Sequence, residues 1–221
     1  MPDTPPSFSA RFRASRARLG FFARLAWRIS GRALALLSLG KAPTPAGADP
    51  LVIADYDQIV EALQTGDTGF LARLGRGFAA SSDSFVGQPW LFNAIDLGSL
   101  AALQWFLAQR VALDGVDKDG RSVLQAAIER AALVDDYDDA PEDPLPMIVA
   151  LLEAGAAINA VSRQGLTPLH VAAALGLANV VRVLLALGAD ASLRDDGFAH
   201  ATPLDYAVQA GHQAVADLLR D

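Results

Sequence analysis

The chain has 221 residues, is rich in Ala and Leu and poor in aromatic residues, which suits one stacked helical domain with an additional tail. It contains no Cys, so a disulfide framework and a thiolate metal site are both excluded. No run of 18 uncharged apolar residues occurs, so the sequence predicts no clear transmembrane helix.

The net charge of −7 is distributed unevenly. Residues 1–48 carry seven Arg and one Lys against Asp3 alone, whereas residues 49–221 carry 10 basic and 24 acidic side chains. The sequence therefore predicts a basic arm over residues 1–50 and an acidic folded domain over residues 51–221. A folded part this acidic argues against a general nucleic-acid binder.

Three interpretations of the arm compete. Arg24, Arg28 and Arg32 lie on one face of a helix and apolar residues on another, which favours contact of residues 8–39 with an anionic membrane surface. The apolar run 33–39 before the small residues 46–48 favours a cleaved export leader and a periplasmic protein instead. A disordered basic arm, or a start placed too far upstream, is the third. Without cleavage, the protein is expected in the cytoplasm or at a membrane surface.

A helix–turn–helix pattern recurs from residue 55 onward. Residues 55–83 form a degenerate first unit, and residues 84–116 and 117–159 form the next two, since Leu91 and Leu124 are 33 residues apart. Leu124 and Leu169 are 45 residues apart, so 12 residues are inserted, which we place at 134–146, between the two helices of the third unit. The last two units are expected at 160–192 and 193–221.

The insertion carries six acidic residues between Asp135 and Asp143. Its prolines prevent a continuous helix. It lacks the Gly and the terminal Glu of a calcium loop, so a solvated loop or a docking site for a basic partner is favoured over a metal site. The docking residues would be Asp135, Asp136, Tyr137, Asp138 and Asp139.

The fourth unit has the clearest pattern. Thr167 is a good N-cap for a helix that begins with Pro168, and Gly176 ends that helix before a second one. The full stretch reads G-L-T-P-L-H-V-A-A-A-L-G-L-A-N-V-V-R-V-L-L-A-L-G-A-D from Gly165 to Asp190. In these positions it resembles an ankyrin repeat. Ser122-Val123-Leu124-Gln125 and Thr202-Pro203-Leu204-Asp205 replace the Thr-Pro-Leu-His motif in the neighbouring units, and the second unit loses it at Pro89.

The resemblance implies an all-α ankyrin-repeat solenoid of about five units with degenerate terminal units, and a non-enzymatic protein that binds a protein partner, possibly a basic one. It implies structural roles for His170 and His212, no cofactor and no metal, and we expect a monomer. Carried over by position, the partner-binding residues on the concave face and hairpin tips include the insertion residues named above. The others are Phe85, Val86, Gln88, Asp96, Lys118, Asp119, Arg121, Glu129, Arg130, Arg163, Gln164, Leu166, Ala174, Leu175, Phe198, His200 and Gln209.

Two alternatives stay open. An acidic protein of this size could neutralise a basic toxin or nuclease, as immunity proteins do, or it could be an effector secreted into another cell. The Ala- and Arg-rich composition is typical of a bacterial protein from a high-GC genome.

Overall fold

The computed structural model describes residues 56–83, 87–131, 143–196 and 200–220. The basic arm, Phe85, Val86, the acidic residues 135–139 with Tyr137, and Phe198 lie outside these ranges. Residues 58–221 form one compact unit. The predicted boundary between arm and domain at residue 50 stays a prediction.

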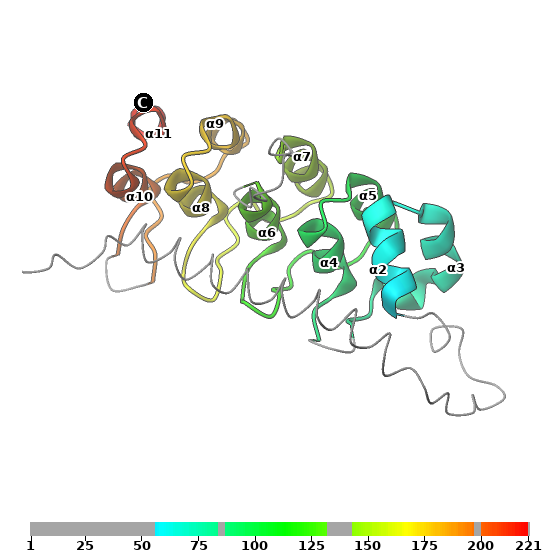
Figure 1. Ribbon diagram of the computed structural model, residues 1–221. Helices are drawn as coiled ribbons and strands as arrows, with labels where there is room; N and C mark the ends of the chain where they lie inside the picture. Colours follow the sequence, from blue (N-terminus) through cyan, green and yellow to red (C-terminus); the bar gives the residue numbers. More distant parts are fainter. Residues whose placement is uncertain (1–55, 84–86, 132–142, 197–199, 221) are drawn as a thin grey trace, which may run out of the picture. The chain divides into compact units, whose positions relative to one another are not determined.

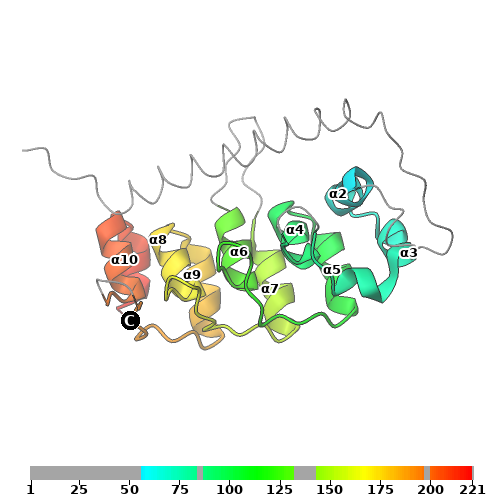
Figure 2. The same cartoon turned by 90° about the horizontal axis from the view of Figure 1, so that it is seen from below.

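Ten helices occur in the described residues, arranged as five consecutive pairs (Figures 1 and 2). The pairs are α2 (Tyr56–Thr65) with α3 (Thr68–Ala79), α4 (Trp90–Asp96) with α5 (Leu100–Ala108), α6 (Val123–Arg130) with α7 (Leu145–Glu153), α8 (Pro168–Ala174) with α9 (Ala178–Ala186), and α10 (Pro203–Ala210) with α11 (Gln213–Leu218). The same residues contain no strand, only isolated bridges such as Val116 to Ser122. The all-α prediction is confirmed for this part of the chain.

The pairs stack side by side in two rows (Figure 2). Helices α4, α6, α8 and α10, which we call the inner row, each pack against the next member of that row. Helices α5, α7, α9 and α11 form the outer row, and α3 packs against α5 at its start. Small residues permit the close approach within the inner row, since Ala94, Ala127, Ala172 and Ala207 are all at most 1 % exposed.

The helix starts of the inner row follow the sequence motif. Thr167 and Thr202 each accept from the backbone N–H three residues later, and the side chain of that residue closes a capping box. Ser122 and Gln125 form the same box, although their unit lacks the Thr-Pro-Leu-His letters. Such caps contribute about 1 kcal/mol each. Pro89, by contrast, makes no side-chain cap, which confirms the predicted loss of the cap in the second unit.

Aromatic residues pack between the first helix pair and the second. Helix α3 is interrupted at Gly75, whose φ of 78° and ψ of −177° are not helical. The chain then directs Phe78 against Trp90, Trp105 and Phe106, with ring centroids 5.4 to 6.3 Å apart. Aromatic burial at this end stabilises a pair whose sequence departs from the repeat pattern.

The insertion lies between the two helices of the third unit, because α6 ends at Arg130 and α7 begins at Leu145. Helix α7 starts slightly earlier than expected and includes Pro146 in its first turn, where a missing N–H costs no helical hydrogen bond. None of the helices described is long and apolar enough to span a membrane.

Candidate functional site: hairpin tips and the polar network beside them

The turns that lead into α6 and α8 are bound to each other. We call residues 116–121 the third tip and residues 161–166 the fourth tip. Arg163 N donates to Gly120 O at 2.9 Å, and Gln164 Nε2 donates to Asp119 O at 3.2 Å. Gly120 has a φ of +79° and lies directly against Arg163, so a side chain at this position would collide with it. The two tips therefore form one continuous and rigid edge.

Each tip is also held by a polar side chain at an equivalent position. Asp117 Oδ1 accepts from the backbone N–H groups of Asp119 and Arg121 at 2.9 and 2.8 Å. Ser162 Oγ accepts from Gln164 N and Leu166 N, both at 3.2 Å. Asp and Ser side chains commonly close turns in this way. We did not select Asp117 or Ser162 from the sequence, although their place before a turn glycine was a usable signal.

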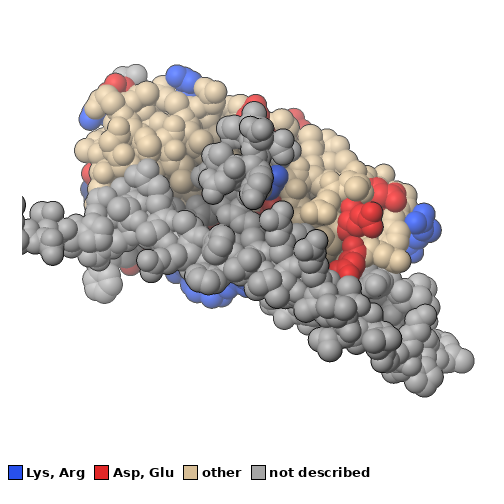
Figure 3. Space-filling view, in the orientation of Figure 1, with Lys and Arg blue, Asp and Glu red and all other residues tan. Residues whose placement is uncertain are grey.

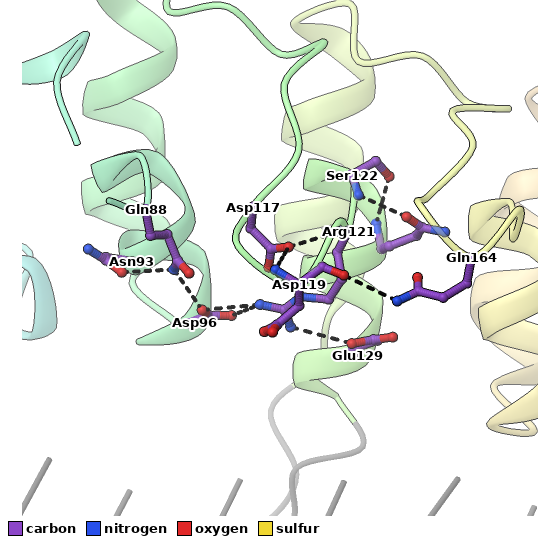
Figure 4. A network of polar contacts seen from close by, with 10 residues as sticks. Gln88, Asn93, Asp96, Asp117, Asp119, Arg121, Ser122, Glu129 and Gln164 are labelled. Carbon is purple, nitrogen blue, oxygen red and sulfur yellow. Dashed lines mark hydrogen bonds and ion pairs between the residues drawn. The ribbon is translucent and has the colours of Figure 1, made fainter. Parts of the chain in front are cut away.

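Arg121 connects the third tip to two inner helices (Figure 4). Its Nη2 lies 3.1 Å from Asp96 Oδ1 on α4, its Nη1 lies 3.4 Å from Glu129 Oε2 on α6, and its Nε donates to Asp117. Burial lowers the pKa of Arg121, but the three carboxylates raise it by more, so its pKa lies above the ordinary value. The guanidinium therefore stays charged and bonds the second unit to the third.

Asp96 is the centre of the remaining contacts (Figure 4). Gln88 Nε2 donates to Asp96 Oδ2 at 3.1 Å and to Asn93 Oδ1 at 2.8 Å. Arg130 Nη1 reaches back from α6 to donate to Asp96 O at 2.8 Å. Together with the contacts of Arg121, these bonds join side chains of the second unit to side chains of the third.

A second kind of contact links successive units through the residue at the fourth position of the Thr-Pro-Leu-His motif. Gln125 Nε2 donates to Leu166 O at 2.6 Å, and His170 Nε2 lies 3.1 Å from Ala201 O. Thr167 N donates to His170 Nδ1 at 3.1 Å, so the hydrogen-bond pattern assigns the ring proton to Nε2. His212 Nε2 likewise lies 3.2 Å from Ala174 O. The structural roles predicted for His170 and His212 are confirmed.

His170 makes the stability of the array depend on pH. Burial lowers its pKa below the ordinary value of about 6.5, against the opposing effect of its bond to Ala201. The charged ring is therefore less favourable in the folded state than in the unfolded state. This contribution to stability is fully present above pH 6.5 and is lost as the pH falls through the folded pKa. His170→Gln, which copies Gln125, should remove that dependence. Between pH 7.5 and pH 5.5 (about one unit either side of the free value), urea unfolding should show a larger loss of stability for wild type than for the variant.

The structure separates the predicted partner-binding residues into three groups. Exposed side chains are those of Lys118, Asp119, Arg163, Gln164, His200 and Gln209, and partly buried ones are those of Asp96, Arg121, Arg130, Leu166, Ala174 and Leu175. Gln88 and Glu129 are buried, at 3 % and 7 % exposure, so the expectation that they are exposed is wrong. Gln88 bonds to Asp96 and Glu129 pairs with Arg121, so both side chains take part in the network and not in an exposed surface. The part of the chain that is described contains no cluster of three His, Asp or Glu residues placed to hold a metal.

Comparison with known proteins agrees with this arrangement. Residues 140–221 match the family model described as ankyrin repeats (3 copies). The chain is 33 % identical over 138 residues to the B-cell lymphoma 3 protein homolog of Mus musculus, which is 62 % of this chain and 27 % of that protein. It is 31 % identical over 128 residues to the probable E3 ubiquitin-protein ligase XBOS34 of Oryza sativa subsp. japonica, 57 % of this chain and 22 % of that protein. The chain thus spans about a quarter of the length of these relatives.

Proposed function

We propose that this chain binds a protein partner along its joined third and fourth tips. Residues 140–221 match the ankyrin-repeat model, and such repeats typically serve as non-enzymatic protein-interaction modules. The observation that carries the proposal is the rigid edge formed by these tips. Lys118, Asp119, Arg163 and Gln164 are all exposed there, on backbone held by the bonds from Arg163 N and Gln164 Nε2. A pre-formed surface reduces the entropy lost on binding.

The joined third and fourth tips carry charged side chains that are exposed to solvent. Basic side chains appear at the lower edge of the space-filling view, where the hairpin turns lie below the inner row (Figures 1 and 3). Exposed charges that contribute little to folding can change without loss of the fold, because such substitutions usually alter stability by less than about 0.5 kcal/mol. Lys118 and Arg163 are therefore suited to contacts with a partner, while Arg121 is engaged in holding the tip.

The charge of the partner is a separate part of the proposal. Residues 49–221 are acidic overall, which favours a basic partner at low ionic strength through electrostatic steering. The predicted docking residues Asp135, Asp136, Asp138 and Asp139 would extend that attraction, and the tips would set its orientation. Neutralisation of a basic toxin and action as a secreted effector are the alternatives that the identity of the partner will separate.

The test compares two double variants of equal charge change. Lys118→Glu with Arg163→Glu alters the tips, whereas Arg76→Glu with Arg182→Glu alters exposed residues on α3 and α9. Affinity capture from native cells, followed by a direct binding titration of the captured protein, should show loss of binding for the tip variant alone. General attraction to a basic partner would rise equally in both variants, so a loss confined to the tip variant reports lost contacts. An equal change of binding in both variants would remove the tips from the binding site. Thermal melts of both variants serve as the folding control.

A further inference from the structure

On α4, α6 and α8, one face of the helix is covered by the inner helix of the next unit. No described helix covers the corresponding face of α10. One apolar position recurs in the inner row at Ile95, Ile128, Ala173 and Val208. The first three are each 0 % exposed, because the inner helix of the next unit covers them, whereas Val208 is 55 % exposed. Val208 lies in a groove of about 550 Å³ together with Leu204, Arg194, His200 and Asp205. A single exposed valine needs no explanation, but Val208 shares this groove with Leu204 and has charged residues around it, which is the composition of a binding surface.

The residue at the fourth position of the Thr-Pro-Leu-His motif indicates that a further unit in the usual register does not fit on this face. Gln125 and His170 each direct an N–H to a backbone carbonyl of the following unit. Asp205 stands at the same position in α10, and its Oδ2 accepts from Thr202 N and Thr202 Oγ1, both at 2.8 Å. A unit stacked in the usual register would bring its carbonyl against this carboxylate, with no proton between them. The face therefore suits an occupant that supplies donors.

The chain carries such a donor beside the same groove. Arg194 is exposed, and its Nη1 donates to His200 O at 2.7 Å. Arg194 and Asp205 line the same groove as Leu204 and Val208, and no direct ion pair joins them, although the charge of Arg194, after the hydrogen bonds to the carboxylate, helps to lower the pKa of Asp205. An apolar strip with a cation and an anion beside it is complementary to a copy of itself turned by a twofold rotation.

From this arrangement we propose that two copies of the chain pair through their α10 faces. Val208 of each copy would pack across the axis, and Asp205 would accept from Arg194 of the partner subunit, so that each pair occurs twice. This surface is separate from the third and fourth tips, so a dimer leaves the proposed partner edge of both copies open. The proposal replaces the monomer expected from the sequence and stands independently of the proposed function.

Analytical ultracentrifugation of the full chain, from about 1 to about 200 µM, tests the pairing. Wild type should show a monomer–dimer equilibrium, and Val208→Asp should weaken it by more than about tenfold, since a carboxylate would be buried in the contact. Val149→Asp is the matched control, because Val149 is 37 % exposed on α7, away from α10. A wild-type chain that stays monomeric throughout, or a dimer equally stable in both variants, would overturn the proposal.

A charge exchange distinguishes a lost contact from a lost fold. Arg194→Asp alone and Asp205→Arg alone should each be monomeric, because like charges then face each other across the axis. Mixed in equal amounts, they should form a heterodimer with two ion pairs. Asp205 of the first variant then meets Arg194 of the second, and the two substituted positions form the other pair with its charges reversed. A mixture that stays monomeric while both variants keep a native melt would show that these two residues do not meet.

Discussion

Replacing Leu184 with Asp is expected to unfold the repeat array. Leu184 lies on α9 and is 0 % exposed. A carboxylate there has no partner, and loss of a buried leucine alone costs about 2–5 kcal/mol. Domains of this size are stable by about 5–15 kcal/mol, so the variant should retain little or no cooperative unfolding transition. Urea unfolding followed by circular dichroism measures the loss for all helices.

Tryptophan fluorescence shows how far the unfolding spreads. Trp90 and Trp105 both belong to the aromatic cluster around Phe78, far from α9 in the order of units. In a repeat array each unit depends on its neighbours, so damage at α9 should first appear in the helical signal and then in these residues. Leu187→Asp is the control, as Leu187 ends the same helix and is 55 % exposed. Equal melts for Leu184→Asp and Leu187→Asp would show that the assigned core face is wrong.

The parts of the fold that could be predicted are those specified by neighbouring residues. Thr167, Pro168 and His170 each have a local role in starting α8, and each was placed correctly from the sequence. Leu169 and Ala172 are both 0 % exposed, and burial of such a helix face follows a short period that a single unit displays. The fold class follows from such local rules, repeated along the chain.

The network around Arg121 could not be predicted, because it depends on contacts between units. Arg121 and Asp96 are 25 residues apart, and only the stacking of α4 on α6 brings them within 3.1 Å. Positional comparison assigned Gln88 and Glu129 to an exposed surface, since the repeat pattern leaves both positions outside the core. Their burial follows from bonds to side chains that are particular to this sequence.

The bend in α3 was missed for a related reason. The helix–turn–helix unit expected over residues 55–83 agrees with the observed helix pair, in which Asp67 caps α3. Gly75 gave no separate signal, because a single glycine within a helical pattern is often tolerated. The bend places Phe78 against Trp90, and that contact joins two units.

Replacing Arg121 with Met is expected to destabilise the array by about 2–4 kcal/mol, less than the cost at Leu184. Removal of one partner from a buried ion pair usually costs about 3–5 kcal/mol, and solvent reduces this because the Asp96 side chain is 34 % exposed. Methionine keeps the aliphatic part of the side chain, so the loss reports the charge. Arg163→Met is the control on the next tip, where the side chain is exposed. Urea midpoints that agree for the two variants would contradict a structural role for Arg121.

Salt and a double-mutant cycle then identify the cause. Without Arg121, the carboxylates of Asp96, Asp117 and Glu129 repel one another, and this repulsion is screened at about 0.5 M salt. The deficit of Arg121→Met should therefore shrink as salt is added, whereas a packing defect would keep it constant. Asp96→Asn should cost less in the Arg121→Met background than in wild type, by a coupling energy of about 0.5–3 kcal/mol. Additive costs would mean that the 3.1 Å contact joins the two units without stabilising them.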